Sequence, residues 1–180
     1  MIKKKKENSG VSVSKVKFAI RKMKANNGKG NVPLRDEWET PQDMWNKLHK
    51  QYNFKFDCCA STSNKKCKDY SRKLEEESTK WQRICWMNPP FSKAYKMFEC
   101  FFKIVNKGIA IYRCDNMETK IWQELIFPNA TWIFIPNRRI AYEGMEGNGS
   151  RFPSALIGLN VKEIKDLGGI TLTPSEKRGT

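Results

Sequence analysis

The run Asn88-Pro89-Pro90-Phe91 combines residue types that suit recognition of a planar amino group. Two adjacent prolines fix φ at about −65° and remove two backbone donors, so this turn is expected to be rigid and outward-facing. The side-chain oxygen of Asn88 and the carbonyl of Pro89 can accept hydrogen bonds from an amine, and the Phe91 ring can stack on its face. Exocyclic amines of nucleobases are such groups, and enzymes that modify them first lift the base out of the stack. The alternative is a Pro-Pro turn that ends a core strand, with Phe91 packed inside.

Short apolar segments alternate with amphipathic ones and must position this turn. Thr40 is expected to cap a helix that has Pro41 in its first turn, and Ser92 to cap a second helix that Gly108 stops. The buried faces of these two helices are predicted at Met44, Trp45, Leu48 and Tyr52, and at Ala94, Met97, Phe98, Phe101, Phe102 and Val105. A third helix is expected over 118–127, and strands over 54–60, 84–87, 109–112, 131–135 and 152–159. The stretch 65–80 is charged and ambiguous, either a loop or a loop with a short helix.

This order of elements predicts an α/β fold. The sheet should be mostly parallel, with helices on both faces and a C-terminal antiparallel hairpin whose connection includes the glycine-rich residues 144–149. The domain is expected to span 36–165, with a C-terminal tail over 166–180. Ligands of such sheets bind beyond the carboxyl ends of the strands. The loop after Asp57 and the turn at Asn88 should therefore face one cleft.

The charge of the chain is concentrated at its start. The whole sequence of 180 residues carries a formal net charge of +15, and residues 1–35 hold 11 Lys and Arg against the single acid Glu7. A basic arm of this kind, expected to be flexible, indicates binding to nucleic acid, although a solubilising leader is the alternative. The absence of a long apolar run or of an apolar segment after the first lysines argues against a membrane helix or a secretory signal. Six cysteines without a C-x-x-C pair and a single histidine predict no metal site.

Three segments resemble the phage-type DNA adenine-N6 methyltransferases, which use S-adenosylmethionine. The segments are Trp38-Glu39-Thr40-Pro41, then Phe54-x-Phe56-Asp57-x-x-Ala60, and Trp81 followed by Asn88-Pro89-Pro90-Phe91-Ser92. Arg138-Arg139-Ile140 and Phe152-Pro153-Ser154-Ala155-Leu156 are similar to the late strand pair of the family, so the resemblance covers roughly 38–160. It implies a Rossmann-like S-adenosylmethionine-dependent methyltransferase fold. It also implies a phage or prophage source and a cytoplasmic location, in the host if the protein is phage-encoded.

The resemblance assigns roles to individual residues. Thr40, Pro41, Asp57, Ala60 and Asn88 are expected to bind S-adenosylmethionine, and Asn88, Pro89, Pro90 and Phe91 to form the catalytic turn. The alternative for Asp57 is a strand-end carboxylate that caps backbone N–H groups. The acid that would hold the cofactor ribose is not identifiable among Asp69, Glu75, Glu76 and Glu77. The loop at 58–64 lacks the glycines that are common in methyltransferase cofactor loops, which is the best argument for an inactive relative.

Contacts with double-stranded DNA are expected from basic residues on the rim of the cleft and in the arm. Arg138, Arg139 and Arg151 flank the glycine-rich loop, and Lys22 and Lys24 lie in the arm. Surface solvation is an equally good account of each arginine alone. The resulting hypothesis is methyl transfer to the exocyclic amine of a flipped adenine in DNA. Two alternatives stay open: a non-catalytic DNA-binding relative, and a methyltransferase that acts on an RNA base, a cytosine amino group or a protein amide.

Overall fold

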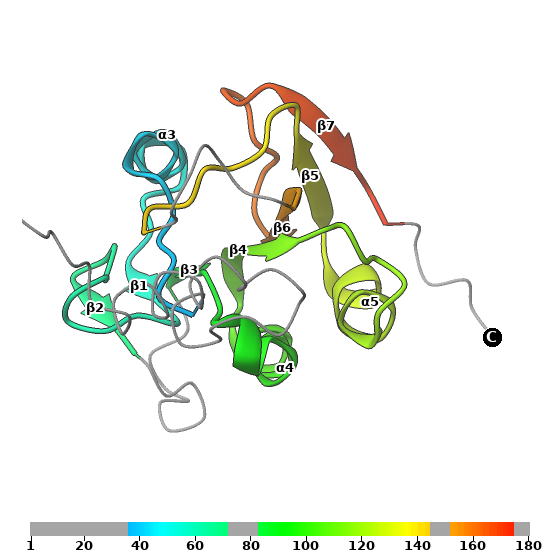
Figure 1. The fold of residues 1–180 in the computed structure, drawn as a ribbon, viewed down its shortest axis with the longest axis horizontal. Helices are drawn as coiled ribbons and strands as arrows, with labels where there is room; N and C mark the ends of the chain where they lie inside the picture. Colours follow the sequence, from blue (N-terminus) through cyan, green and yellow to red (C-terminus); the bar gives the residue numbers. More distant parts are fainter. Residues whose placement is uncertain (1–35, 72–82, 145–151, 175–180) are drawn as a thin grey trace, which may run out of the picture. The chain divides into compact units, whose positions relative to one another are not determined.

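The computed structural model describes residues 36–71, 83–144 and 152–174. The chain divides into two units, 1–34 and 35–180, and every described residue belongs to the second. The described strands form one sheet (Figure 1). Its order is β2 (Asp69–Tyr70), β1 (Phe56–Asp57), β3 (Ile84–Met87), β4 (Lys107–Arg113), β6 (Ser154–Leu159), β5 (Trp132–Pro136) and β7 (Gly169–Leu172).

The sheet is mixed in direction. β1 pairs in parallel with both β2 and β3, and β3 pairs in parallel with β4. β6 lies between β4 and β5 and is antiparallel to both, and β7 is antiparallel to β5. The expected α/β class is confirmed. The sheet is not mostly parallel as expected, because the three pairings on the β1 side of β4 are parallel and the three on the other side are antiparallel.

Helices cover both faces of the sheet (Figure 1). Helix α3 (Gln42–Tyr52) buries Met44, Trp45, Leu48 and Tyr52, the face that its periodicity predicted, against Trp86, Ile109 and Trp132 of the sheet. The opposite face is covered by α4 (Ala94–Ile104), the π-helix η3 (Ile121–Ile126) and α5 (Phe127–Asn129). Apolar burial on both faces fixes the strand ends from which the functional residues project.

Both helix starts differ from the sequence expectation. Pro41, not Thr40, occupies the N-cap position of α3, and the Thr40 side chain makes no capping hydrogen bond. A short 3₁₀ helix, η2 (Phe91–Lys93), precedes α4, so Ser92 is not its cap. Thr40 instead lines a pocket, and Ser92 is hydrogen-bonded to Asp36, as described below.

The end of α4 and two strands also differ from expectation. Helix α4 ends at Ile104, and Gly108 lies inside β4, where a Cβ atom would come within 2.7 Å of the Cys85 carbonyl oxygen. This glycine therefore permits close approach of β3 and β4 and does not stop the helix. Strand β2 forms in the segment that was ambiguous from sequence, and β7 forms within the expected tail.

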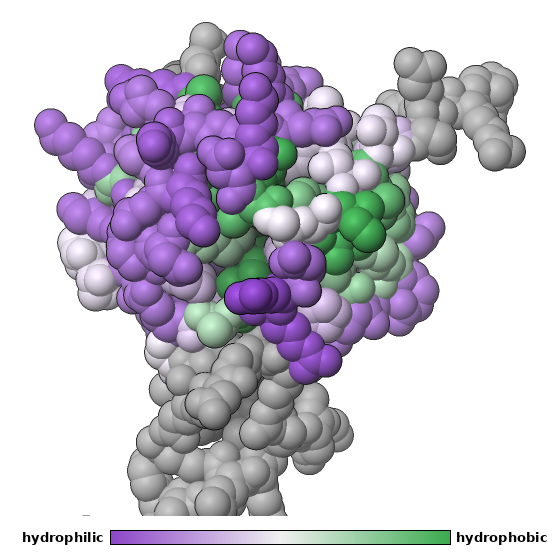
Figure 2. Space-filling view, turned by 90° about the horizontal axis from the view of Figure 1, so that it is seen from above, coloured by the Kyte–Doolittle hydropathy of each residue, from purple (hydrophilic) through white to green (hydrophobic). Residues whose placement is uncertain are grey.

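The surface seen in Figure 2 is hydrophilic over most of its area, with an apolar region on the side where β5 and β7 lie in Figure 1. Ile170 and Leu172 of β7 are among the exposed large apolar residues. Within 36–71, 83–144 and 152–174, no helix has the length and apolar character needed to cross a membrane.

Candidate active site

A pocket lies beyond the carboxyl ends of β1 and β3. The two strands pair in parallel with Asp57 opposite Trp86, so Asp57 and Asn88, which come at or just after the strand ends, are brought together. The pocket encloses about 300 Å³ of empty space, which includes open solvent. Its described lining consists of Asp36, Trp38, Glu39, Thr40, Asp57, Cys59, Asn64, Lys66, Trp86 and Asn88. One cleft therefore contains both segments that the sequence analysis placed at this edge.

The Asn88 side chain is held in one orientation. Its Nδ2 donates a hydrogen bond of 2.9 Å to the backbone carbonyl of Trp38. Only the amide nitrogen can donate to a carbonyl, so this contact assigns the two ends of the amide and leaves Oδ1 on the other side. Asn88 is half-buried and lines the pocket, and the next residue, Pro89, is buried. The turn thus offers an acceptor whose position is fixed before any ligand binds.

The segment 36–40, which we call the strap, runs alongside the Asn88 turn. Besides the bond from Asn88 to Trp38, the Asp36 carboxylate accepts hydrogen bonds from both the backbone N–H (3.1 Å) and the hydroxyl of Ser92. These contacts attach the strap to residues on either side of Pro89 and Pro90. The hydroxyl that was expected to cap α4 therefore secures the turn.

Aromatic rings pack around the strap and the turn. The Trp38 ring meets Phe91 edge to face at 6.0 Å and stacks on Phe152 at 6.1 Å and on Tyr142 at 6.4 Å between centroids. Phe91 also meets Phe152 at 5.4 Å. Phe91 is half-buried, so it is partly packed against these rings and partly accessible. The packing fixes the ring plane that a base would meet.

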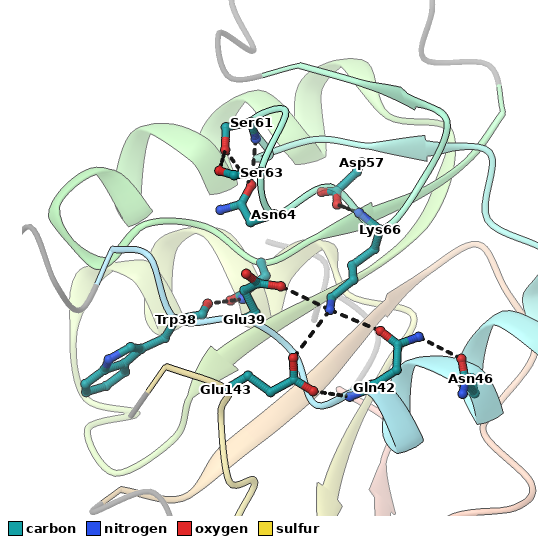
Figure 3. Close-up of polar contacts among 11 residues, drawn as sticks. Trp38, Glu39, Gln42, Asn46, Asp57, Ser61, Ser63, Asn64, Lys66 and Glu143 are labelled. Atoms are coloured by element: carbon teal, nitrogen blue, oxygen red, sulfur yellow. Dashed lines mark hydrogen bonds and ion pairs between the residues drawn. The ribbon is translucent and has the colours of Figure 1, made fainter. Parts of the chain in front are cut away.

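Asp57 organises the loop that follows β1. Its carboxylate accepts hydrogen bonds from the backbone N–H groups of Cys59 (3.4 Å) and Lys66 (2.9 Å), while Asn64 Oδ1 accepts from the Ser61 N–H at 2.7 Å (Figure 3). In a glycine-rich loop such amides are often presented to the ligand. In this glycine-free loop, side chains accept hydrogen bonds from three of the backbone amides, so these three are not available to a ligand.

The Asp57 carboxyl group is almost completely buried, and burial raises its pKa to about 6 despite two backbone hydrogen bonds and the charge of Lys66, which lower it. The Glu39 charge adds a smaller upward contribution. A carboxylate whose ionised form is costly gains most from a cationic partner. Asp57 is therefore suited both to capping the loop and to receiving a positive charge.

Thr40 contributes a hydroxyl without a protein partner. The residue is 1% exposed and lines the pocket, and its Oγ1 makes no hydrogen bond in the described structure. A buried, unsatisfied hydroxyl costs about 1–3 kcal/mol in the unliganded protein.

The other predicted site residues have diverse locations. Pro41 starts α3 and Ala60 is buried, and neither is among the lining residues. Arg138 and Arg139 are exposed on the segment after β5, whose carboxyl end lies at the same edge of the sheet as those of β1 and β3. Asp69 pairs with Arg83 at 2.7 Å and does not line the pocket. Lys22, Lys24, Glu75, Glu76, Glu77, Trp81 and Arg151 lie outside the described residues.

Sequence reasoning gave no role to Asp36, Glu39, Cys59, Asn64 or Lys66, which all line the pocket. Each is a common polar or charged residue in an irregular segment, where no periodicity marks it. The approach of Lys66 to Glu39 depends on contacts across the fold.

The comparisons with known proteins agree with this geometry. The model of the family described as DNA N-6-adenine-methyltransferase (Dam) matches residues 27–151, more than half of the chain, and so includes the strap, Asp57 and the Asn88 turn. No curated protein matches the chain. The family methylates DNA and its methyltransferases generally use S-adenosylmethionine, and no finding favours the alternatives of an inactive relative or another substrate. The chain therefore belongs to the DNA N-6-adenine-methyltransferase (Dam) family and is a DNA adenine-N6 methyltransferase.

Proposed function

We propose that this chain binds S-adenosylmethionine in the pocket between β1 and β3 and methylates an adenine flipped out of double-stranded DNA against the Asn88 turn. The observation that carries the proposal is the fixed Asn88 amide at the pocket wall, held by Trp38. The fold proposed with it is a Rossmann-like methyltransferase fold. Its support is the parallel β1, β3 and β4 with helices on both faces of the sheet, and the pocket at the strand ends.

The pocket lining fits the chemistry of this cofactor. S-adenosylmethionine carries a sulfonium, an ammonium and a carboxylate, together with ribose hydroxyls. The lining contains the carboxyl groups of Asp36, Glu39 and Asp57 against the single ammonium of Lys66, so it favours a cation. Thr40 Oγ1 supplies an unused hydrogen-bonding group for a polar part of the cofactor. When bound, the cofactor supplies an electrophilic methyl group.

The catalytic turn acts on the adenine amine. Base flipping costs a few kcal/mol, and stacking on Phe91 offsets about 1–3 kcal/mol of this cost. The Asn88 Oδ1 and the Pro89 carbonyl each accept one amino hydrogen. These two hydrogen bonds favour a pyramidal nitrogen whose lone pair is less delocalised into the ring. Well-oriented placement of reactants lowers a barrier by about 7–11 kcal/mol, so positioning by the turn is the main contribution of the protein.

DNA contacts are proposed for Arg138, Arg139 and Arg151 on the rim, and for Lys22 and Lys24 in the basic arm over 1–35. The support is the exposure of Arg138 and Arg139 beyond the end of β5, and the positive charge of the arm in the sequence. Phosphate contacts from Lys and Arg supply sequence-independent affinity, while the flipped base provides the chemical selectivity. The catalytic domain is proposed to begin at 36 and to extend beyond the expected bound of 165, since β7 pairs with β5 in the same sheet.

The direct test is transfer of labelled methyl from S-adenosylmethionine to duplex DNA by the wild type and by Asn88→Ala. We expect N6-methyladenine with the wild type and a fall in kcat of about 100-fold or more in the variant, the size seen when one positioned polar group is removed from an active site. Asn129→Ala is the matched control, since Asn129 is exposed and its side chain bonds only within its own helical segment. Equal rates for wild type and Asn88→Ala would refute the role of the turn. Cofactor binding without transfer to any DNA would point to RNA or protein as the substrate.

A further inference from the structure

Lys66 is the one basic residue among the described residues that line the pocket, and its side chain is only 10% exposed. Its Nζ lies 3.2 Å from Glu39 Oε2, 3.3 Å from Gln42 Oε1 and 3.9 Å from Glu143 Oε2 (Figure 3). None of the motifs that carry the family resemblance includes Lys66, so they give this lysine no role. Burial of an unpaired ammonium group is costly, so these oxygen partners stabilise the charged form of Lys66 at the pocket.

The ammonium joins three segments that are distant in sequence. Glu39 of the strap and Glu143 exchange two backbone hydrogen bonds of 3.0 and 2.9 Å, which places their side chains side by side. Glu143 Oε1 also accepts the Gln42 N–H at 2.8 Å, in the first turn of α3. Lys66 itself belongs to the loop after β1. The lysine therefore neutralises two adjacent carboxylates that would otherwise repel each other at the wall of the pocket.

Lys66 is also linked to Asp57. Its backbone N–H donates to Asp57 Oδ2 at 2.9 Å, and its positive charge lowers the pKa of that carboxyl group, whereas the Glu39 charge raises it. The thiols of Cys58 and Cys67 also lie near Asp57. Burial keeps their pKa values far above neutral, with that of Cys67 at about 12, so they stay uncharged in the range where Asp57 titrates.

We propose that Lys66 is a positioning residue for cofactor binding: its ammonium holds Glu39 and Glu143 together beside the pocket, and its backbone N–H holds the Asp57 carboxylate that receives the ammonium group of the cofactor. This inference rests on the proposed function. Lys66 does not repel the cationic cofactor, because its own charge is already shared between Glu39 and Glu143.

The direction in which cofactor affinity changes with pH follows from the ionisation of Asp57. Its pKa of about 6 in the unliganded protein is above that of an ordinary Asp, so the ionised form dominates only above pH 6. A cationic ligand binds this form, so affinity should be highest above pH 6 and should fall as the pH decreases through 6. Removal of the Lys66 charge should raise the pH at which cofactor affinity is half of its maximum. Removal of the Glu143 charge leaves Lys66 less neutralised, so it should lower this pH.

The test is calorimetric titration of the full chain with S-adenosylmethionine from pH 5 to 8. For Lys66→Met we expect an acid midpoint about one pH unit higher and affinity about threefold lower at pH 6.5, with near-normal binding at pH 8. Lys66→Arg should behave like the wild type. Lys68→Met is the matched control, since Lys68 is an exposed lysine two positions along the same loop.

Glu143→Gln keeps a side-chain oxygen that can accept the hydrogen bond from the Gln42 N–H. We expect its acid midpoint for cofactor binding to be lower than that of the wild type, the opposite of the shift for Lys66→Met. It also tests the proposal if Lys66→Met fails to fold. A uniform loss of affinity at every pH, or midpoints equal to that of the wild type in both variants, would overturn the role of Lys66. Absence of binding by the wild type itself would refute the proposed function, and that result is distinct from any difference between variants.

Discussion

At the scale of single residues, the most informative atoms are polar groups whose partners the protein does not supply. Asn88 has a partner for its nitrogen, whereas Thr40 has none for its buried hydroxyl. Sequence reasoning selected both residues, but it expected Thr40 to cap α3. Since Pro41 takes the cap position, the hydroxyl of Thr40, a residue that lines the pocket, is left without a partner. The unsatisfied group lowers the stability of the unliganded protein and is proposed to be satisfied when the cofactor binds.

Thr40→Val should therefore affect stability and binding in opposite directions. Loss of the unsatisfied hydroxyl should raise the free energy of unfolding of the unliganded protein by about 1 kcal/mol, while affinity for S-adenosylmethionine falls by about tenfold. Urea unfolding and calorimetric titration measure the two quantities. Thr40→Ser, which keeps the hydroxyl, is the control and should retain binding. A variant that is less stable but binds normally would show that the hydroxyl has a purely structural role.

At the scale of elements, the strap and the turn form one unit through Asp36, Ser92 and the bond from Asn88 to Trp38. Asp36→Ala removes both hydrogen bonds to Ser92 and loosens the strap that orients the amide. We expect kcat for methyl transfer to fall about tenfold, because small displacements of a positioned group slow reaction strongly. The Kd for the cofactor should change less, since the Asp36 carboxylate is already hydrogen-bonded to Ser92 and the carboxylates of Glu39 and Asp57 remain in the lining.

Steady-state kinetics with separate measurement of cofactor Kd tests this prediction. Asp43→Ala is a suitable control, because Asp43 is an exposed acid on α3 and does not line the pocket. A Kd that rises tenfold at unchanged kcat would place Asp36 in cofactor binding, and the positioning argument would be wrong.

Elements with strong periodicity were predictable from sequence, and those shaped by distant contacts were not. The buried face of α3 and the strand 84–87 before the turn agree with expectation because a helical repeat and a bounded apolar run are local signals. Strands β2 and β7 pair at the two edges of the sheet and contain no buried residue. β2 has only two residues, and the alternating Ile170 and Leu172 of β7 are exposed, so neither strand has a buried apolar face that would mark it in the sequence. The interior place of Gly108 depends on the approach of Cys85 from another strand.

The residues of the site also divide into those that a local sequence signal predicts and those that distant contacts position. Asn88 and Asp57 were identifiable because each directly follows or ends an apolar strand, and parallel strands place such residues together. Lys66 and Asp36 were not, because their roles come from contacts with Glu39 and Ser92, which are distant in sequence.

At the scale of the whole molecule, negative and positive charges are concentrated in different parts of the chain. The pocket lining has more carboxylates than ammonium groups, whereas the chain has a net charge of +15, most of it contributed by residues 1–35. This division is consistent with a cationic cofactor in the cleft and a polyanion outside it. Arg138 and Arg139 are exposed beyond β5, so they are the described residues best placed to test the DNA contacts.

The salt dependence of DNA binding should therefore report these contacts separately from catalysis. For Arg138→Gln combined with Arg139→Gln, the slope of log K against log salt should decrease by about one for each phosphate that the protein no longer neutralises, while cofactor affinity stays constant. Fluorescence anisotropy with duplex DNA at several salt concentrations gives the slope. Lys22→Gln combined with Lys24→Gln should reduce it similarly, because the arm is proposed to contact phosphates too. An unchanged slope in both double variants would refute phosphate contacts by these residues, and DNA affinity would then have to come from other basic residues of the chain.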